Sequence, residues 1–273
     1  MKELAASVEK HYSQRPGLEA VLENLKRKGI DLEKVRAQDL YPYDQSHAGG
    51  IAATAQLAQR AGIQPHSSVV DVGCGTGGAA RYLHAEFSCQ VVGIDLTLAR
   101  LRAGMDFNRL IGATNQIHLL AAQADALPLP SSFADVVWTQ HVTMNIPDHA
   151  TFVRECARVL KPAGRLACHE WFLSRPGIAP PSLPFPLPWA PNPSLNHAVS
   201  SEEFLQILRE QNFHPSAEDV TAAMLASLAK DVRTLSSHGA PAERVAAGEN
   251  LVRAATDGLF HCLMITAPLA GPI

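Results

Sequence analysis

The sequence predicts a globular α/β protein whose mainly parallel sheet carries helices on both faces. From residue 68 onward, short apolar runs alternate with helix-compatible segments of about 10–16 residues, the pattern of strand–helix–strand units. The chain has 273 residues, of which 47% are hydrophobic and 18% charged. A chain of this length buries enough apolar surface to fold without disulfides or a metal, and it corresponds to one full domain with additions or two small domains.

The composition excludes several classes of protein. Lys+Arg number 23 and Asp+Glu 26, a net charge of −3, which argues against a nucleic-acid-binding domain. Neither a run of about 18 apolar residues nor the apolar core of a signal peptide is present, so we expect a cytoplasmic protein without a membrane partner. The 5 cysteines form no CxxC pair and their number is odd. This spacing predicts neither a metal site nor a disulfide framework.

The first 50 residues are expected to form a helical cap or lid. Residues 2–40 are helix-compatible, with apolar residues at 18, 21, 22 and 25 spaced for one helical face, and Gly29 ends that helix. The stretch 41–50, YPYDQSHAGG, combines a proline with a glycine pair and predicts a loop. A helix over 52–60 then ends near Gly62.

Residues 51–173 are expected to form the ligand-binding core. The predicted strands are five apolar runs, at residues 68–73, 90–95, 117–123, 134–140 and 165–172. Parallel strands buried on both faces have such continuous apolar runs.

Residues 174–273 are assigned to the same domain. The proline density of 174–198 excludes a helix or a central strand, but Trp189 and its apolar neighbours predict a segment that packs and walls a cavity. A helix over 201–211 is predicted to begin at Ser200 or Ser201, with Glu203 completing a capping box. Two further helices are predicted at 221–237 and 241–256, and a last buried strand at 259–267.

A glycine-rich turn follows the first predicted strand, in the sequence VVDVGCGTGG at 69–78. Glycines let the backbone turn sharply and approach a ligand without a Cβ in the way. Asp95 ends the next strand about 20 residues later, where a carboxylate can accept both hydroxyls of a ribose. Asp71, at the entrance to the turn, repels phosphate and suits a cationic ligand. This pattern favours S-adenosylmethionine (SAM) over NAD.

Four segments resemble the motifs of class I SAM-dependent methyltransferases: VVDVGCGTGG, VVGIDLT, QADALPLPSSFADVVWTQHV and RVLKPAGRLACHEWF. The resemblance covers about residues 41–215 and is nearest to small-molecule enzymes of the sarcosine/dimethylglycine and ubiquinone-biosynthesis types. It implies a Rossmann-like sheet of seven strands in the order 3-2-1-4-5-7-6, with an antiparallel last strand that 259–267 fits.

The resemblance also implies the donor site. The residues implied to contact SAM come from the cap and from the ends of the first four strands: Gln45, Asp71, Gly73, Cys74, Gly75, Asp95, Leu96, Asp125, Ala126, Gln140 and His141. Asp71 and the glycine turn would face the methionine part, Asp95 the ribose, and Asp125 the adenine. The product would be S-adenosylhomocysteine.

Three histidines are candidate catalytic residues, because a pKa near 6.5 suits proton acceptance. His141 follows the fourth predicted strand, His169 ends the fifth, and His47 lies in the loop before the first. Each could instead pack or shape the cofactor site. His169 is next to Glu170, and strand alternation allows only one of the two to face the pocket.

Residues near these histidines are candidates for the acceptor site: Tyr43, Met144, Asn145, Glu170 and Trp189. An aromatic ring such as that of Tyr43 can face a sulfonium or ammonium group, although packing among the first helices is the favoured explanation. Trp138, inside a strand, is read as core, and Arg81 as a locally bonded or solvent-facing side chain.

The sequence therefore predicts a SAM-dependent methyltransferase (EC 2.1.1 type) that transfers a methyl group to an N, O, S or C atom of a small molecule by in-line displacement. One alternative is a quinone or lipid-precursor C-methyltransferase, and another is a catalytically silent SAM-binding module. An NAD(P)-dependent oxidoreductase would need GxGxxG together with a downstream catalytic Tyr/Lys pair or His, and that set is not found. The N/D-P-P-Y/F motif of DNA and protein-glutamine methyltransferases is also missing. The extra C-terminal helices offer a surface for a homodimer.

Overall fold

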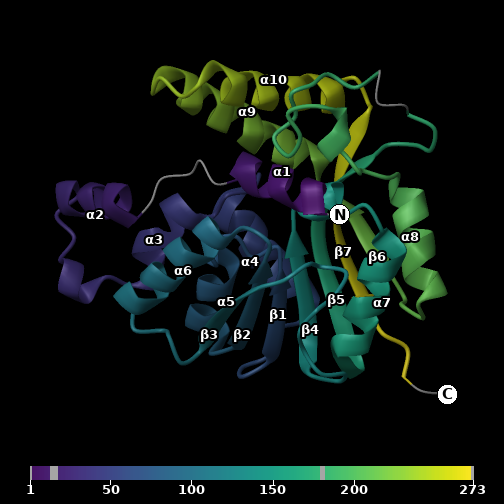
Figure 1. Cartoon of the computed structure of the whole chain (residues 1–273), viewed down its shortest axis with the longest axis horizontal. Helices are drawn as coiled ribbons and strands as arrows, with labels where there is room; N and C mark the ends of the chain where they lie inside the picture. Colours follow the sequence, from purple (N-terminus) through teal and green to yellow (C-terminus); the bar gives the residue numbers. More distant parts are fainter. Residues whose placement is uncertain (1, 13–17, 179–181, 272–273) are drawn as a thin grey trace.

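A seven-stranded sheet forms the centre of the molecule, in the order β3-β2-β1-β4-β5-β7-β6 (Figure 1). The computed structural model describes residues 2–12, 18–178 and 182–271, so residues 13–17 and 179–181 of the predicted cap and proline-rich segment lie outside the described residues. The strands are β1 Ser68–Val72, β2 Gln90–Asp95, β3 Ile117–Ala121, β4 Ala134–Gln140, β5 Leu160–Leu173, β6 Ser216–Asp219 and β7 Phe260–Pro268. The predicted fold class and strand order are confirmed.

Strands β1 to β5 pair in parallel, and β7 pairs antiparallel with both β5 and β6. The strand β6 has no counterpart among the predicted apolar runs. All four of its residues are exposed, so it lacks the apolar pattern by which strands are recognised in a sequence. β5 also begins earlier than predicted, at Leu160 rather than at residue 165.

Helices cover both faces of the sheet, as the alternating pattern predicts. On one face, α4 (Gly50–Ala61), α5 (Gly78–Phe87) and α10 (Ala242–Thr256) contribute buried side chains to a core built on β1 and β2. On the other face, α7 (His149–Val159) and α8 (Ser201–Glu210) pack on β4 and β5. Trp138 of β4 is fully buried, as its strand position predicts. The predicted capping box of α8 is present, with Ser200 and Glu203 bonding each other's backbone.

The N-terminal cap differs from its prediction in one place. It contains α1 (Lys2–Tyr12), α2 (Leu18–Arg27), the short helix η1 (Leu32–Lys34) and α3 (Ala37–Asp44). The segment 41–50 was predicted to be a loop because of Pro42, but α3 continues through that proline to Asp44. Pro42 removes only one backbone donor, and burial of Leu40 and Asp44 holds the helix. The loop is confined to residues 45–49.

Arg81 of α5 is buried, which corrects its interpretation as a locally bonded or exposed side chain. Its Nε donates to Asp44 Oδ2 at 2.9 Å, and neither side chain is exposed to solvent. The guanidinium also donates to Asn108 Oδ1 at 2.8 Å and to the carbonyl of Thr76 at 2.6 Å. This ion pair joins the cap to the helix that follows the glycine turn.

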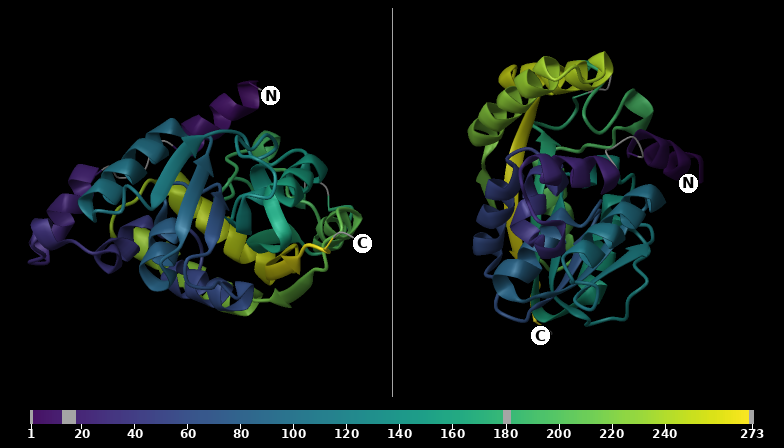
Figure 2. Two further views of the ribbon diagram at one scale, coloured as in Figure 1. Left: turned by 90° about the horizontal axis from the view of Figure 1, so that it is seen from below. Right: turned by 90° about the vertical axis from the view of Figure 1, so that its left-hand side faces the viewer.

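The predicted C-terminal helices α9 (Thr221–Ser237) and α10 pack against each other above one end of the sheet (Figures 1 and 2). α9 also contacts the 45–49 loop, where the backbone N–H of Gly49 donates to Ser227 Oγ at 3.2 Å. None of the described helices is long and apolar enough to span a bilayer.

Candidate active site

A cavity lies at the carboxyl ends of β1, β2 and β4, the edge at which open α/β sheets bind ligands. Val8 and Tyr12 of α1 line it from the N-terminal side, and Pro188 and Trp189 line it from the proline-rich segment. His11 Nε2 lies 3.0 Å from the carbonyl of Pro188, so α1 and this segment meet over the cavity.

The turn between β1 and α5 depends on glycine at the cavity. Gly73 and Gly75 have φ values of 73° and 57°, a left-handed conformation that other residues rarely adopt. A Cβ at Gly73 would collide with Val142, and one at Gly75 with the guanidinium of Arg100. The backbone N–H of Gly75 donates to Asp95 Oδ2 at 2.8 Å, which fixes the turn to the end of β2.

Asp71 lies in the cavity wall with an unpaired acceptor. Only 3% of the residue is exposed, and its Oδ2 finds no hydrogen-bond donor among the described residues. Burial, reinforced by the charge of Asp95, raises the pKa of Asp71 to about 8, against the opposing effect of Arg81 and Arg100. A buried carboxyl group with a free acceptor fits the ammonium group of a cationic ligand.

Asp95 lines the same cavity from the end of β2. Its Oδ1 accepts from the backbone N–H of Thr97 at 2.8 Å, and its Oδ2 from that of Gly75. Each carboxylate oxygen can accept a second hydrogen bond, so the pair of hydroxyls on a ribose fits this carboxylate. Leu96 and Asp125 also line the cavity, whereas Ala126 is exposed and does not.

Three histidine rings gather beside the end of β4. The ring centroids of His141 and His169 are 4.7 Å apart, and that of His47 lies 5.8 Å from His141. His141 has a φ of 57°, an uncommon backbone conformation outside glycine, and its backbone N–H donates to the carbonyl of His169 at 2.9 Å. Burial lowers the pKa of both His141 and His169, the latter to about 3, so both imidazoles are neutral at neutral pH.

Gln45 supports His47 and is not among the residues that line the cavity. Gln45 Oε1 lies 3.2 Å from His47 Nε2 and accepts from Thr54 Oγ1 at 2.9 Å. Thr54 Oγ1 also donates to Gln140 Oε1 at 3.2 Å. This network links the loop that carries His47 to the end of β4.

The side chain of Glu170 lies on the opposite side of β5 from that of His169, as strand alternation requires. Glu170 is fully buried and accepts from the backbone N–H of Val142 at 2.7 Å and of Thr143 at 3.1 Å, and from the hydroxyls of Thr139 and Thr143. Burial raises its pKa to about 7. Glu170 therefore holds the turn after β4 and is not among the cavity residues.

Met144, Asn145 and Trp189 line the far end of the cavity. Asn145 Nδ2 donates to the carbonyl of Trp189 at 2.9 Å, and Asn145 Oδ1 accepts from the hydroxyl of Tyr12 at 2.9 Å. The indole of Trp189 donates to Asn196 Oδ1 at 2.8 Å and packs edge-on against Phe260. The proline-rich segment is thus fixed as a wall of the cavity.

Tyr43 lies apart from the cavity residues, in the small core of the cap, with Lys28 Nζ 5.1 Å from the centre of its ring. The tyrosine that lines the cavity is Tyr12, whose ring centre lies 5.4 Å from the guanidinium carbon of Arg100. Sequence reasoning missed both Tyr12 and Arg100. Arg100 lies in the first turn of α6 (Leu98–Leu110), shortly after Asp95, and this spacing could have suggested that it reaches the cavity. Nothing in the sequence around Tyr12 indicates that it does.

The structure therefore brings most of the predicted site residues to one cavity: His47, Asp71, Gly73, Cys74, Asp95, Leu96, Asp125, Gln140, His141, Met144, Asn145 and Trp189. The others do not line it: Tyr43, Gln45, Gly75, Ala126, His169 and Glu170. Gly75 still shapes the turn, and His169 lies directly behind His141.

Comparison with known proteins points to one family. Residues 70–168 match a family model described as a methyltransferase domain. Cycloartenol-C-24-methyltransferase of Arabidopsis thaliana is 36% identical over 119 residues, which cover 43% of this chain and 35% of that protein. Glycine/sarcosine/dimethylglycine N-methyltransferase of Actinopolyspora halophila is 31% identical over 109 residues, covering 40% of this chain and 19% of that protein. The matched regions are thus about a third or less of these relatives.

Solved structures show the same fold. Geranyl diphosphate C-methyltransferase from Streptomyces coelicolor A3(2), in complex with Mg²⁺, geranyl-S-thiolodiphosphate and S-adenosyl-L-homocysteine, superposes with a TM-score of 0.72 at 18% identity, covering 97% of each chain. The 4+2 cyclase SpnF superposes with a TM-score of 0.71 at 21% identity, covering 88% of this chain and 98% of the other.

Proposed function

The chain carries a methyltransferase domain at residues 70–168, and from this premise we propose that the protein transfers a methyl group from SAM to a small-molecule acceptor. The observation that carries the proposal is the placement of Asp71, the glycine turn and Asp95 around one cavity. SAM supplies a methyl group on a positively charged sulfur, and its transfer leaves a neutral thioether. The protein's main task is then to align donor and acceptor.

The residues present fit the donor. Asp71 offers a buried, unpaired oxygen to the ammonium group of the methionine part, and Asp95 offers its carboxylate to the ribose hydroxyls. Asp125 lines the cavity near Asp95 and would accept from the adenine amine. Gly73, in a left-handed conformation and without a Cβ, lets the side chain of Val142 pack directly against the turn.

The acceptor is proposed to bind at the end of the cavity formed by His141, Met144, Asn145 and Trp189. A neutral imidazole at His141 can accept a hydrogen bond from an N–H or O–H group of the acceptor. The wall residues exclude water from this end, which favours methyl transfer to the acceptor over solvent.

A second candidate is a C-methyltransferase for a quinone or lipid precursor. The observation that favours it is the apolar lining at the acceptor end, where Val8, Met144, Pro188 and Trp189 surround the space. A catalytically silent SAM-binding module is the third, because a 4+2 cyclase shares the fold and a fold alone does not select a reaction.

The test is a donor titration followed by a transfer assay. Calorimetry with SAM, S-adenosylhomocysteine and NADH should show binding of the first two only. Purified protein with methyl-labelled SAM is then offered amines, phenols, thiols, quinols and prenyl or sterol precursors, and label in the acceptor identifies the class. Absence of SAM binding would overturn the proposal, and SAM binding without transfer to any acceptor class would identify a silent module. We also propose that two copies pair through the C-terminal helices, and light scattering on the purified protein tests this.

A further inference from the structure

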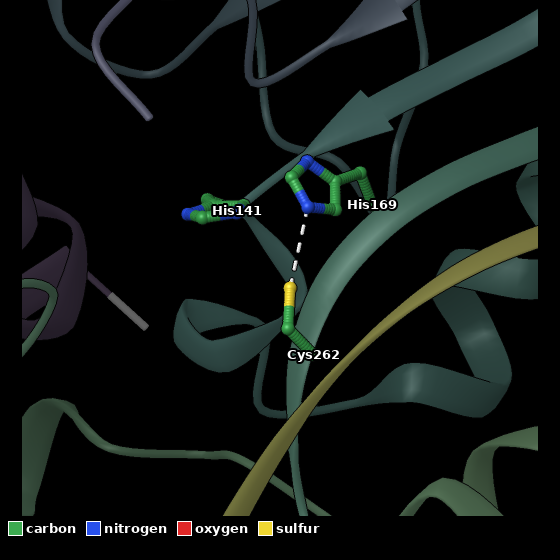
Figure 3. Close-up of side chains that lie close together, drawn as sticks. All are labelled: His141, His169 and Cys262. Carbon is green, nitrogen blue, oxygen red and sulfur yellow. Dashed lines mark hydrogen bonds between the residues drawn. The ribbon is translucent and has the colours of Figure 1, made fainter. Parts of the chain in front are cut away.

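Two histidines and a cysteine converge next to the acceptor end of the cavity. His141 follows β4, His169 is on β5 and Cys262 is on β7, and Figure 3 shows the side chains of His169 and Cys262 directed toward each other, with the ring of His141 beside them. One nitrogen or sulfur atom of each residue lies within 4.8 Å of those of the other two. The geometry points to a binding site for a divalent transition-metal cation, with Zn²⁺ the best match, held by His141, His169 and Cys262.

The chemistry of these donors selects the cation. Two imidazole nitrogens and one thiolate sulfur suit Zn²⁺, whereas Mg²⁺ and Ca²⁺ prefer oxygen ligands. His169 Nε2 and Cys262 Sγ are already 3.2 Å apart, close to the separation of neighbouring ligands around a tetrahedral ion with metal–ligand bonds of about 2.0–2.3 Å. Small side-chain movements would bring a ring nitrogen of His141 into the coordination sphere of the same ion.

The state of the ligands also suits a metal. The Nε2 atom of His141 is buried and has no hydrogen-bond partner within the described part of the chain, which leaves its lone pair available to a cation. The Cys262 thiol must lose its proton to solvent as the Sγ–metal bond forms, so each cation bound releases one proton from this residue.

The site has an open side. His169 and Cys262 are fully buried, whereas His141 lines the cavity. Three protein ligands with one open position are the arrangement of catalytic rather than structural zinc sites. If the proposed methyl transfer is correct, on which this step alone rests, the open position would bind the acceptor's nucleophilic atom and lower its pKa.

The sequence alone does not reveal this metal site, because its ligands come from three strands that are distant along the chain. Metal sites are recognised in sequences by short spacings such as CxxC, and no such spacing relates these three residues. The strand order places β5 between β4 and β7, and this alone brings the ligands together.

The test is metal binding by the full-length protein after treatment with a chelator. Titration with Co²⁺ should give one equivalent of bound metal, with visible bands of a tetrahedral ion and a thiolate-to-cobalt band in the near ultraviolet. Zn²⁺ should displace it, and elemental analysis should find one zinc per chain. The variant Cys262→Ser should lose the thiolate band, and His141→Gln should weaken Co²⁺ binding by more than about tenfold.

The matched control is Cys89→Ser, which changes another fully buried free cysteine outside the cluster and should leave every band intact. Thermal melting confirms that each variant is folded, and His141→Gln, on the cavity side, provides a second test if Cys262→Ser does not fold. Absence of Co²⁺ binding, or a thiolate band that survives in Cys262→Ser, would overturn the inference. Donor binding is measured separately by calorimetry, so failure of the metal site and failure of the proposed function are distinguishable.

Discussion

Arg81 and Asp44 form an ion pair that is completely shielded from solvent, 2.9 Å between Nε and Oδ2. Asp44 is the last residue of α3, immediately before the loop of His47, and Arg81 lies in the first turn of the helix that follows the glycine turn. This one contact therefore fixes the 45–49 loop relative to the glycine turn between β1 and α5.

Replacing Arg81 with methionine should destabilise the protein by about 3–5 kcal/mol, because it leaves the buried Asp44 carboxyl group without its partner. The free energy of unfolding in urea is the measurement. The double variant Arg81→Met with Asp44→Asn should recover part of the loss, since it removes the uncompensated charge. As a control, Arg109→Met breaks an exposed ion pair with Asp106 and should cost no more than about 1 kcal/mol. Similar losses for Arg81→Met and Arg109→Met would refute this role.

Asp95→Ala should weaken SAM binding by about 10- to 100-fold, about 1.4–2.8 kcal/mol, because it removes charge-assisted hydrogen bonds to two ribose hydroxyls, which water replaces in part. Calorimetry measures the change. Asp106→Ala removes a carboxylate at a more exposed position of α6 (Leu98–Leu110) and should leave donor affinity unchanged. If Asp95→Ala binds SAM as tightly as the unmodified protein, Asp95 only holds the backbone of Gly75 and Thr97.

SAM binding should strengthen as the pH rises to about 8 and then level off. The pKa of Asp71 is raised to about 8 by burial and by Asp95, with Arg81 and Arg100 acting in the opposite direction. The carboxyl group is therefore protonated at pH 7 in the free protein, and a cationic donor binds its charged form, so binding expels a proton. Calorimetry is carried out in two buffers of different ionisation enthalpy. The difference between the two binding enthalpies gives the number of protons released on binding.

The variant Asp71→Asn should bind SAM more weakly and without this slope. The same pKa shift has a consequence for folding. Because the folded state holds the Asp71 proton more tightly than the unfolded chain, this residue's contribution to stability falls as the pH rises from about 4 to about 8. In Asp71→Asn this loss of stability should be absent. The measurement is the free energy of unfolding in urea at several pH values between about 4 and 8. A flat affinity profile for the unmodified protein would contradict both expectations.

Trp189→Ala should impair acceptor use about tenfold or more while leaving donor affinity within about twofold. The ring, which at this size buries roughly 150–250 Å², forms one wall of the acceptor end, and donor contacts come from other strands. Donor Kd and acceptor kcat/KM are measured on the same preparation. Leu183→Ala truncates a buried side chain of the same segment that does not line the cavity and should change neither quantity. Equal losses of donor and acceptor binding would show that Trp189 supports the whole fold.

The core of the fold could be predicted because each of its elements has a local signal. The five runs of the parallel sheet are apolar on both faces, and α8 begins with a capping box that can be read from Ser200 and Glu203. The same signals predicted that Asp71 and Asp95 would meet at one cavity, because both lie on strands, Asp95 at the end of its own.

The rest depends on tertiary contacts. β6 is exposed along its length and exists only because β7 offers it an edge. α3 passes through Pro42 because Asp44 reaches Arg81, a contact across 37 positions of the chain. Tyr12 rather than Tyr43 reaches the cavity because of how the cap docks, which no periodicity in residues 2–44 encodes.

The position of β7 has a consequence for how the protein is made. β7 forms the only ladder of β6 and one of the two ladders of β5 among the described strands (Figure 1). A ribosome delivers β5 about 90 residues before β7, so the nascent chain holds β5 with an open, apolar edge during that interval. The sheet is complete only when β7 inserts between β5 and β6, which have both left the ribosome before it. Aggregation during synthesis, rather than instability of the finished fold, is therefore the hazard that this topology creates, and slowing translation between β5 and β7 should lower the soluble yield.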